Sequence, residues 1–432
     1  MNKRSKKTNM DKIVCDDVSK YRLNRFIVRA ETPEGYLLYN TTTGSIVHIK
    51  DEKDLKESFD QLVEMYDYVP IDFDEISWVE QLRKENLLNV SDKQIYGYTI
   101  LSTMDCNARC FYCYEKGQTH ISMSEKTARD VANFIINNSH GQHQDLRWFG
   151  GEPLMNPKVI DIICNTLQSQ GVIFQSGMIS NGLLFNDGII SKAKTLWNLK
   201  RVQITLDGTK DVYLKAKSYV RPTGEEFDMV INNIDRLINS KIRVTIRLNQ
   251  DLYNTENLLE LLNYLSKRFS KNNGLSVYNS LLFYDSEREG NGLANARTEA
   301  FLKLQNSIIE SGLFRINPLK NRLRISHCMA DNNSSLLISP NGKIGKCEHY
   351  PNQFLVGSIY NSEVDVEILA KWKEKFKSTT KCNNCPLYPQ CVRLKMCPEE
   401  RKQCSFVQCE NKIHLIEKAL LHRYKVYKRN TY

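Results

Sequence analysis

The stretch CNARCFYC, residues 106–113, follows the apolar segment YGYTILST at residues 96–103 and carries three cysteines on one short loop. Their spacing is C-x3-C-x2-C, and an aromatic residue, Tyr112, directly precedes the last cysteine. Three thiolates on one loop can hold three irons of a four-iron cluster and leave the fourth iron without a protein ligand. A zinc knuckle needs a fourth Cys or His nearby, and the nearest, His120, has an unusual spacing. The triplet of Cys106, Cys110 and Cys113 therefore predicts an iron–sulfur cluster whose open iron binds a small molecule.

Three further motifs follow the triplet, each at the end of an apolar segment. They are Gly150-Gly151-Glu152-Pro153 after QDLRWF, Ser180-Asn181-Gly182 after GVIFQSGMI, and QITLDG at residues 203–208. A lone Gly-Gly or Asn-Gly pair usually marks only a turn. Four motifs, each at the end of an apolar strand, are hard to obtain by chance.

With these motifs the chain resembles the radical S-adenosylmethionine (SAM) enzymes. The resemblance implies that the open iron binds SAM and that reductive cleavage yields a 5′-deoxyadenosyl radical. It also implies roles for the motif residues. Tyr112 packs against the adenine, Gly150 and Gly151 let the backbone approach the methionine group, and Glu152 receives the methionine ammonium. Ser180, Asn181, Thr205 and Asp207 line the ribose side, and Arg247, on a later strand, is the candidate for the methionine carboxylate.

Strand and helix patterns alternate from residue 95 to about 313, which predicts parallel strands joined by crossover helices. The strand candidates are YGYTILST, QDLRWFG, GVIFQSGMIS, LKRVQITL, IRVTIRLN and LSVYNSLLFY. Six such units form a partial (β/α)6 barrel, the fold that the resemblance implies. The fold class expected is therefore α/β. The four motifs then lie at the C-terminal ends of strands, where barrel chemistry is found.

Residues 1–20 are expected to be disordered, and residues 21–94 to form a compact module. FIVRA, YLLYN and SIVHI are strand candidates separated by the turn signals TPEG and TTTG, and helical patterns follow at 52–66 and 74–87. This order resembles the winged-helix-like peptide-recognition elements of peptide-modifying radical SAM enzymes. Such modules bind a leader peptide as an added strand at a sheet edge. The alternative is a packing domain that covers the barrel.

Eleven of the thirteen cysteines fall in two groups, at 106–113 and 328–409. The second group resembles the SPASM extension of radical SAM enzymes, here residues 314–432 with a helical tail, which carries one or two auxiliary [4Fe-4S] clusters. The resemblance assigns Cys328, Cys347 and Cys397 to one cluster and Cys382, Cys385 and Cys391 to another, closed by Cys404 or Cys409. Five residues, VRLKM, separate Cys391 from Cys397 where the usual pattern has three, so the ligand set near Cys397 stays open. A zinc ribbon built on Cys382-x2-Cys385 is the competing interpretation.

Composition agrees with a soluble globular protein, with 41% apolar and 25% charged residues among 432. No apolar run approaches the ~18 residues that a membrane helix needs, and no signal peptide is apparent. A cytoplasmic location without a membrane partner is expected. The net charge of +10 comes partly from basic termini, and no stripe of interleaved aromatic and basic residues predicts nucleic-acid binding.

These features lead to one functional hypothesis. The resemblance is to maturases of ribosomally made peptides, of the sactipeptide and ranthipeptide type, which form a thioether from Cys to a carbon. The expected partners are a precursor peptide, whose leader the N-terminal module binds, and a reductant, flavodoxin or ferredoxin. Glu348, directly after Cys347, is the candidate proton-handling group; the alternative is a salt bridge to Lys343 or Lys346. Carbon–carbon crosslinking, epimerisation, a formylglycine-generating sulfatase maturase and a zinc-ribbon nucleic-acid-binding protein are the other candidates.

Overall fold

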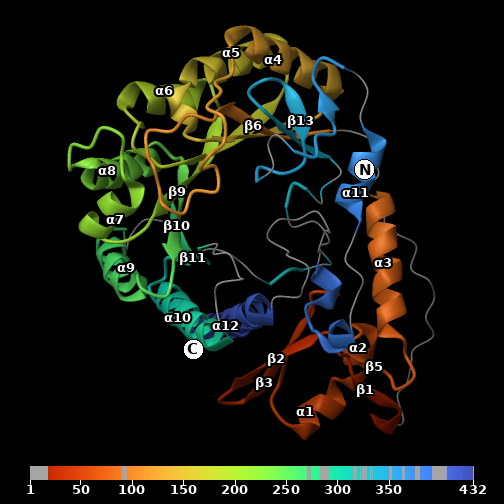
Figure 1. Cartoon of the computed structure of the whole chain (residues 1–432). Coiled ribbons are helices and arrows are strands. Elements are labelled where there is room, and N and C mark those ends of the chain that lie inside the picture. Colours follow the sequence, from red (N-terminus) through yellow and green to blue (C-terminus); the bar gives the residue numbers. More distant parts are fainter. Residues whose placement is uncertain are drawn as a thin grey trace.

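The structure is a computed structural model. It describes residues 18–89, 95–269, 274–282, 291–314, 319–321, 323, 328–330, 332, 334–349, 353–361, 365–374, 380–391 and 406–431. The chain forms an arc of strands and helices, with a smaller N-terminal module at one end (Figure 1). Residues 1–17, which include most of the segment expected to be disordered, lie outside the described residues, and Val18–Lys20 form a 3-10 turn.

The largest element is a nine-stranded sheet with the order β11-β10-β9-β8-β7-β6-β12-β13-β14. Its first six strands in sequence run parallel, as the alternating pattern predicts. These strands are β6 (Gly97–Thr103), β7 (Gln144–Gly150), β8 (Phe174–Ser180), β9 (Leu199–Leu206), β10 (Arg243–Gln250) and β11 (Leu275–Leu281). The sheet ends at β11 and β14 without closing on itself, so the barrel is partial and the α/β prediction is confirmed.

Helices cover the outer face of this sheet and leave its inner face without a helical layer (Figure 1). Alternate strand residues, such as Trp148, Val202 and Ile246, are fully buried in one core with these helices. Every second residue of each strand faces the helices and packs against the apolar side of a helix, which is the usual packing of α/β folds. The helices are α4 (Glu125–Ser139), α5 (Pro157–Ser169), α6 (Asp187–Thr195), α7 (Lys210–Lys217), α8 (Glu226–Asn239), α9 (Thr255–Phe269) and α10 (Asn291–Glu310). No helix of the described ranges combines the length and apolarity that a membrane span requires.

A hairpin from the C-terminal part extends the barrel sheet, which the sequence alone did not predict. Strand β12 (Ser335–Ile338) runs parallel to β6, and β13 (Lys343–Gly345) and β14 (Gly357–Ser358) follow it antiparallel. The apolar side chain of Leu337 is fully buried in a small cluster with Leu101 of β6. The residues after β13 are thereby carried to the edge of the barrel beside the first cysteine loop.

The N-terminal module contains the three predicted strands as an antiparallel sheet of order β2-β3-β4. The helix predicted at 52–66 is instead two short helices, because Ser58 ends the first and begins the second. The strands are β2 (Ile27–Thr32), β3 (Gly35–Asn40) and β4 (Ile46–Ile49), and the helices are α1 (Glu52–Glu57), α2 (Phe59–Glu64) and α3 (Glu75–Asn89). An additional pair, β1 (Tyr21–Leu23) with β5 (Tyr68–Pro70), consists of strands too short to show a period in the sequence.

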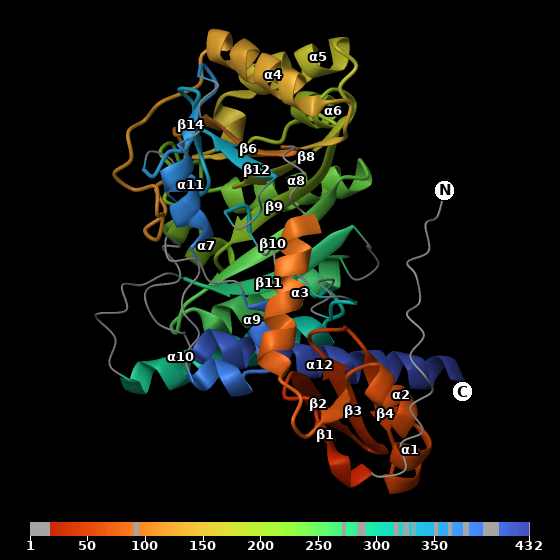
Figure 2. The same ribbon diagram turned by 90° about the vertical axis from the view of Figure 1, so that its right-hand side faces the viewer.

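The C-terminal part connects the barrel and the N-terminal module. Helix α12 (Phe406–Thr431) lies along α10 and β2, as two perpendicular views agree (Figures 1 and 2). Ile416 and Leu420 of α12 are buried against Val28 and Tyr39 of the module. The remaining elements are α11 (Val366–Lys373) and the 3-10 turns Thr380–Asn384 and Tyr388–Gln390.

Candidate functional site

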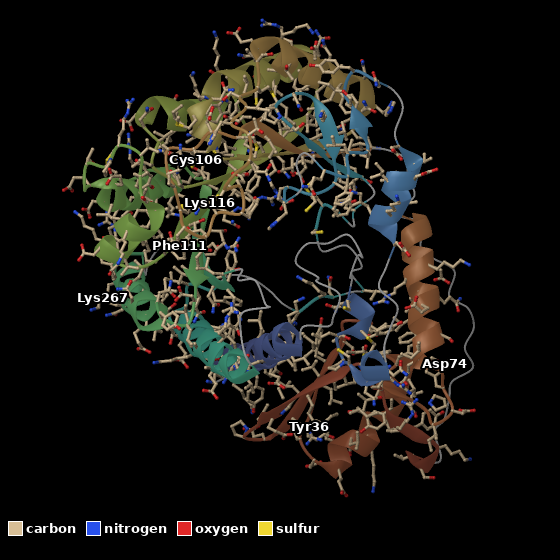
Figure 3. The ribbon with its side chains drawn as sticks, viewed as in Figure 1. Tyr36, Asp74, Cys106, Phe111, Lys116 and Lys267 are labelled. Carbon is tan, nitrogen blue, oxygen red and sulfur yellow. The ribbon has the colours of Figure 1, made fainter. Side chains whose placement is uncertain are left out.

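The loop that carries Cys106, Cys110 and Cys113 follows β6 and is held from two sides. The backbone N–H of Arg109 donates to the carbonyl of Lys217 at 2.9 Å, and that of Val220 donates to Asn107 at 2.9 Å. On the other side, the N–H of Glu152 donates to the carbonyl of Asp105 at 2.9 Å. Cys106 and Phe111 lie on the inner side of the ring of helices (Figure 3). The loop is therefore fixed at the C-terminal end of the barrel strands, as predicted.

The three thiols of this loop are half-buried and form no disulfide with a described cysteine. Burial, and to a smaller extent the neighbouring Glu152, Cys110 and Cys113, raises the pKa of Cys106 to about 12. Burial also raises the pKa of Cys113. Thiols of this kind become thiolates only beside a strong positive charge, which cluster iron supplies. Among the described residues no three Cys, His, Asp or Glu side chains converge on a single ion, whereas a four-iron cluster binds each thiolate at a different iron. The donor set fits such a cluster.

Gly150 and Gly151 let β7 approach the cysteine loop closely. A Cβ at Gly150 would lie 2.1 Å from the carbonyl oxygen of Thr103, and one at Gly151 would lie 2.3 Å from that of Asp105. Real Cβ atoms do not approach backbone so closely, and Gly150 has a positive φ of 114°. The glycines are therefore required by the contact between two strand ends. Their expected role toward the methionine group stays a prediction.

Glu152 is fully buried and lies at the centre of a hydrogen-bond network. Its carboxylate accepts from the Ser180 hydroxyl at 2.9 Å and from the backbone N–H groups of Asn181 and Leu154 at 2.7 and 3.1 Å. Burial raises the pKa of Glu152, although these hydrogen bonds oppose the rise. The structure thus brings the second and third motifs together. Here the Ser180 hydroxyl orients Glu152, so its predicted contact with a ribose stays untested.

A buried lysine, Lys217, is the site residue that the sequence analysis missed. Its ammonium lies 3.0 Å from Asp207 and donates to the Tyr112 hydroxyl at 3.0 Å, and it is 3% exposed. Burial lowers the pKa of Lys217, but Asp207 and Tyr112 outweigh this and hold it above the ordinary value. The amide of Asn249 donates to the other Asp207 oxygen at 3.0 Å. Lys217 lies near the end of a charged helix, DVYLKAK, where nothing in the sequence distinguishes it from the exposed lysines.

Arg247 and Thr205 are register partners on the inner face of the sheet. One Arg247 nitrogen, Nη2, donates to the Ser280 hydroxyl at 3.0 Å. Its Nε is buried and has no hydrogen-bond partner among the described residues. A buried guanidinium donor without a partner destabilises the protein unless an anionic group accepts its hydrogen bond. A carboxylate at this point would do so, and the role expected for Arg247 toward the methionine carboxylate stays a prediction.

Glu348 lies beside the first cysteine loop, because β12 and β13 carry it there. The next residue, His349, stacks on Tyr114 of that loop with ring centroids 4.1 Å apart. Lys346 is buried and donates to the carbonyls of Asn332 and Ser335 at 2.6 and 2.7 Å. No ion pair joins Glu348 to Lys343 or Lys346 within the described part of the chain, so the salt-bridge alternative has no support.

The second cysteine group is described only in part. Cys347 is buried at the end of the hairpin, Cys328 is exposed, and Cys382, Cys385 and Cys391 lie on consecutive tight turns. Cys409 lies in helix α12. Cys397 and Cys404 lie outside the described residues, so the predicted ligand sets stay predictions.

Comparison with known proteins identifies the barrel. Residues 100–284 match the Radical SAM superfamily. The chain is 23% identical over 273 residues to a GTP 3′,8-cyclase of Clostridium perfringens (strain SM101 / Type A), covering 59% of this chain and 80% of that protein.

Two solved structures are similar in fold. Native anSMEcpe with bound AdoMet has a TM-score of 0.57 at 12% identity, over 76% of this chain and 98% of that one. Streptococcus suis SuiB bound to the precursor peptide SuiA has a TM-score of 0.51 at 13% identity, over 86% and 94%. The domain match and the site geometry coincide on β6 to β11. Residues 100–284 therefore form a radical SAM domain, and the protein is a radical SAM enzyme.

Proposed function

We propose that this enzyme modifies a ribosomally made precursor peptide and forms a thioether between a cysteine and a carbon atom. The observation that carries the proposal is the edge strand β4. It pairs only with β3 in the described sheet, so one row of its backbone N–H and C=O groups faces away from the module. A leader peptide can add to such an edge as a further strand. The similarity in fold to SuiB bound to its precursor peptide supports this use of the module.

The residues of the barrel have separate tasks in this proposal. Cys106, Cys110 and Cys113 hold a [4Fe-4S] cluster, and Glu152 and Arg247 hold the charged methionine end of SAM. Together the cluster and SAM supply the radical that removes a hydrogen atom from the peptide. Tyr112, held by Lys217, closes one side of the adenine site, and the Asp207–Lys217 ion pair keeps that wall in place. The protein thus orients the cofactor and aims it at one C–H bond.

Thioether formation removes two hydrogens from the peptide, one from the carbon as an atom and one from the thiol as a proton. The remaining electron must leave through an acceptor. In this proposal the C-terminal cysteines form a SPASM-type extension that would hold one or two auxiliary clusters, and a cluster there would supply the electron acceptor. Glu348, beside Cys347, receives the thiol proton. Flavodoxin or ferredoxin is the proposed reductant for the radical SAM cluster.

Anaerobic co-expression with a short cysteine-bearing open reading frame next to the gene tests the proposal. The product should lose the mass of two hydrogens per thioether, and its cysteine should resist alkylation. A Val47→Pro variant of β4 should bind the precursor at least about tenfold more weakly, because proline removes a backbone donor and disrupts strand pairing. An unmodified precursor would refute the proposal. Two hydrogens lost with a free thiol would indicate a carbon–carbon bond or formylglycine made from serine instead.

Nucleotide cyclisation is a second candidate, favoured by the similarity to GTP 3′,8-cyclases over 59% of the chain. GTP incubated with the reconstituted enzyme, SAM and reductant should remain unchanged if the substrate is a peptide. Consumption of GTP coupled to SAM cleavage would establish the second candidate.

A further inference from the structure

The inner face of the barrel sheet carries a row of arginines. The strand register places Arg147 of β7 beside Gly177 of β8, Gly177 beside Arg201 of β9, and Arg201 beside Arg243 of β10. The residues that flank them in sequence, such as Trp148 and Val202, are buried against the helices. Since side chains alternate across a strand, the arginines point to the opposite, inner face. All three are exposed.

Nothing in the described chain neutralises this row. None of the three guanidiniums forms an ion pair or donates a hydrogen bond to a described residue, unlike most other arginines of the barrel. Asp145, two residues before Arg147 on the same strand, accepts instead from the Gln175 amide at 3.0 Å. A Cβ at Gly177 would lie 3.1 Å from the Nε of Arg201, so the glycine leaves the space through which Arg201 leans toward Arg147.

Such a row is unfavourable for folding alone. Like charges directly opposite each other on neighbouring strands are destabilising, and Arg201 and Arg243 are such a pair. The cost disappears when an anionic ligand lies between the guanidiniums, which bind carboxylates through charge-assisted, often bidentate hydrogen bonds. The row therefore fits a binding surface better than a structural one.

The row lies on the same face as the cofactor site and at a defined distance from it. Arg201 and Thr205 are four residues apart on β9, a separation of roughly 13 Å along a strand. An extended peptide covers this distance in about four residues. Phe149, Ile179 and Gln203 lie between the arginines and the cofactor site on the same face of the sheet. They give this part of the surface two apolar side chains and one polar side chain.

We propose that Arg147, Arg201 and Arg243, the arginine row, bind acidic side chains of the precursor peptide within about four residues of the modified position. The substrate is thus a peptide whose core carries Asp or Glu close to the reacting residue. This inference rests on the proposed function, since it places that peptide on the inner face of the sheet. The net charge of the row selects acidic cores over neutral or basic ones.

Binding of two synthetic probes to the reconstituted full-length enzyme tests the inference. One is a fluorescein-labelled, end-blocked peptide of alternating Glu and Ala, and its twin has Gln in place of Glu. The wild-type enzyme should bind the acidic probe at least about tenfold more tightly at low salt. The double variant R147Q/R201Q should lose that preference and leave binding of the neutral twin unchanged.

A matched control separates the row from the general positive charge of the protein. K194Q/K267Q removes two exposed lysines from α6 and α9, and Lys267 lies on the outer rim of the molecule (Figure 3). Its affinity for the acidic probe should stay within about twofold of wild type, because solvent screens distant surface charges. An equal loss in both double variants, or no preference in the wild type, would overturn the inference.

A charge-reversed variant distinguishes a loss of charge recognition from a loss of folding. R147E/R201E, checked for cluster absorbance and helix content, should bind a Lys–Ala probe in preference to the Glu–Ala probe. Failure of this reversal in a folded variant also counts against the row. The outcomes distinguish the two proposals: a modified precursor without charge preference removes only the arginine row, whereas a charge preference without any modified peptide removes the proposed function.

Discussion

The two cysteine groups are held in place by different parts of the chain. Among the described residues, the loop of Cys106, Cys110 and Cys113 is hydrogen-bonded to neighbouring strand ends and to residues 217–220, all inside the radical SAM domain. The turns that carry Cys382, Cys385 and Cys391 are hydrogen-bonded instead to the N-terminal module, which lies 306 to 358 residues earlier in these contacts. The first group is held by hydrogen bonds inside the barrel, and the second depends on a distant part of the sequence.

Arg83 of helix α3 makes the clearest of these distant contacts. Its buried guanidinium donates to the backbone carbonyls of Tyr388 and Pro389, and to that of Cys391 at 2.8 Å. The Tyr388 hydroxyl donates to Glu80 at 2.5 Å. The module whose edge strand is proposed to bind a leader peptide therefore also supports the turns of the second cysteine group. Both alternatives for the module, leader binding and packing, are compatible with one structure.

The largest effect is expected from Cys110→Ala. Loss of one thiolate leaves the radical SAM cluster with two protein ligands, so SAM cleavage under dithionite should fall to the level without enzyme. The C-terminal group should still bind iron, because the turns that carry Cys382, Cys385 and Cys391 are held by the N-terminal module. A variant in which all three cysteines of the triplet are Ala should retain roughly four to eight irons, for one or two four-iron clusters. SAM cleavage at the wild-type rate by Cys110→Ala would exclude the assignment of the triplet.

Glu348→Gln should separate SAM cleavage from product formation. The glutamine keeps the size of the side chain but cannot take up a proton, so the cluster content and 5′-deoxyadenosine formation should remain normal. The amount of modified peptide should fall about 10²-fold or more, which is the usual rate contribution of a positioned acid–base group. Glu367→Gln, on helix α11, is the control. Full product formation by Glu348→Gln would leave Glu348 without a chemical role.

Local sequence signals predicted the elements that carry their own pattern. The six barrel strands and the three strands of the module follow from the alternation of apolar residues and from turn signals. The four motifs were also placed correctly at strand ends. Each of these features depends on residues close together in the sequence.

Contacts between segments that are distant in the sequence have no such local sequence pattern. Lys217 and Arg83 resemble any other basic residue of an amphipathic helix, and only the fold shows that both are buried. The joining of β12 to β6 and of α12 to β2 depends on which exposed edges and faces meet. Propensity and periodicity do not encode that choice, because it is made by tertiary packing.

Arg83→Ala should weaken the second cysteine group and spare the first. The variant leaves three buried carbonyls without their donor, at a cost of about 2–3 kcal/mol in the free energy of unfolding. When Arg83→Ala is combined with loss of the triplet, the amount of bound iron should decrease, or the iron should become labile to chelators. When Arg83→Ala is the only change, SAM cleavage should persist. Arg29→Ala, an exposed arginine of the same module, is the control. Equal loss of iron from both groups would show that the first group depends on Arg83 as well.

The smallest effect is expected from Glu75, which anchors the start of helix α3. Its buried carboxylate pairs with Arg22 at 2.7 Å and with Arg25, and Arg25 reaches the carbonyl of Asn383 at 3.2 Å, between Cys382 and Cys385. Burial raises the pKa of Glu75, but the hydrogen bonds from Arg22 and Arg25 outweigh it, and the pKa lies below its ordinary value of 4.5. The stabilisation is therefore complete above pH 4.5 and is lost as the pH falls through the lower folded value.

Glu75→Gln should thus cost about 1–2 kcal/mol at neutral pH and flatten the dependence of stability on pH below the ordinary pKa of the carboxyl. Urea unfolding followed by tryptophan fluorescence at neutral and acid pH measures both quantities. Glu31→Gln removes an exposed carboxylate from the same module and should change neither. An acid dependence as steep in Glu75→Gln as in the wild type would mean that other carboxylates govern the acid stability of the module. The support of the second cysteine group would then depend on Arg83 rather than on Glu75 and Arg25.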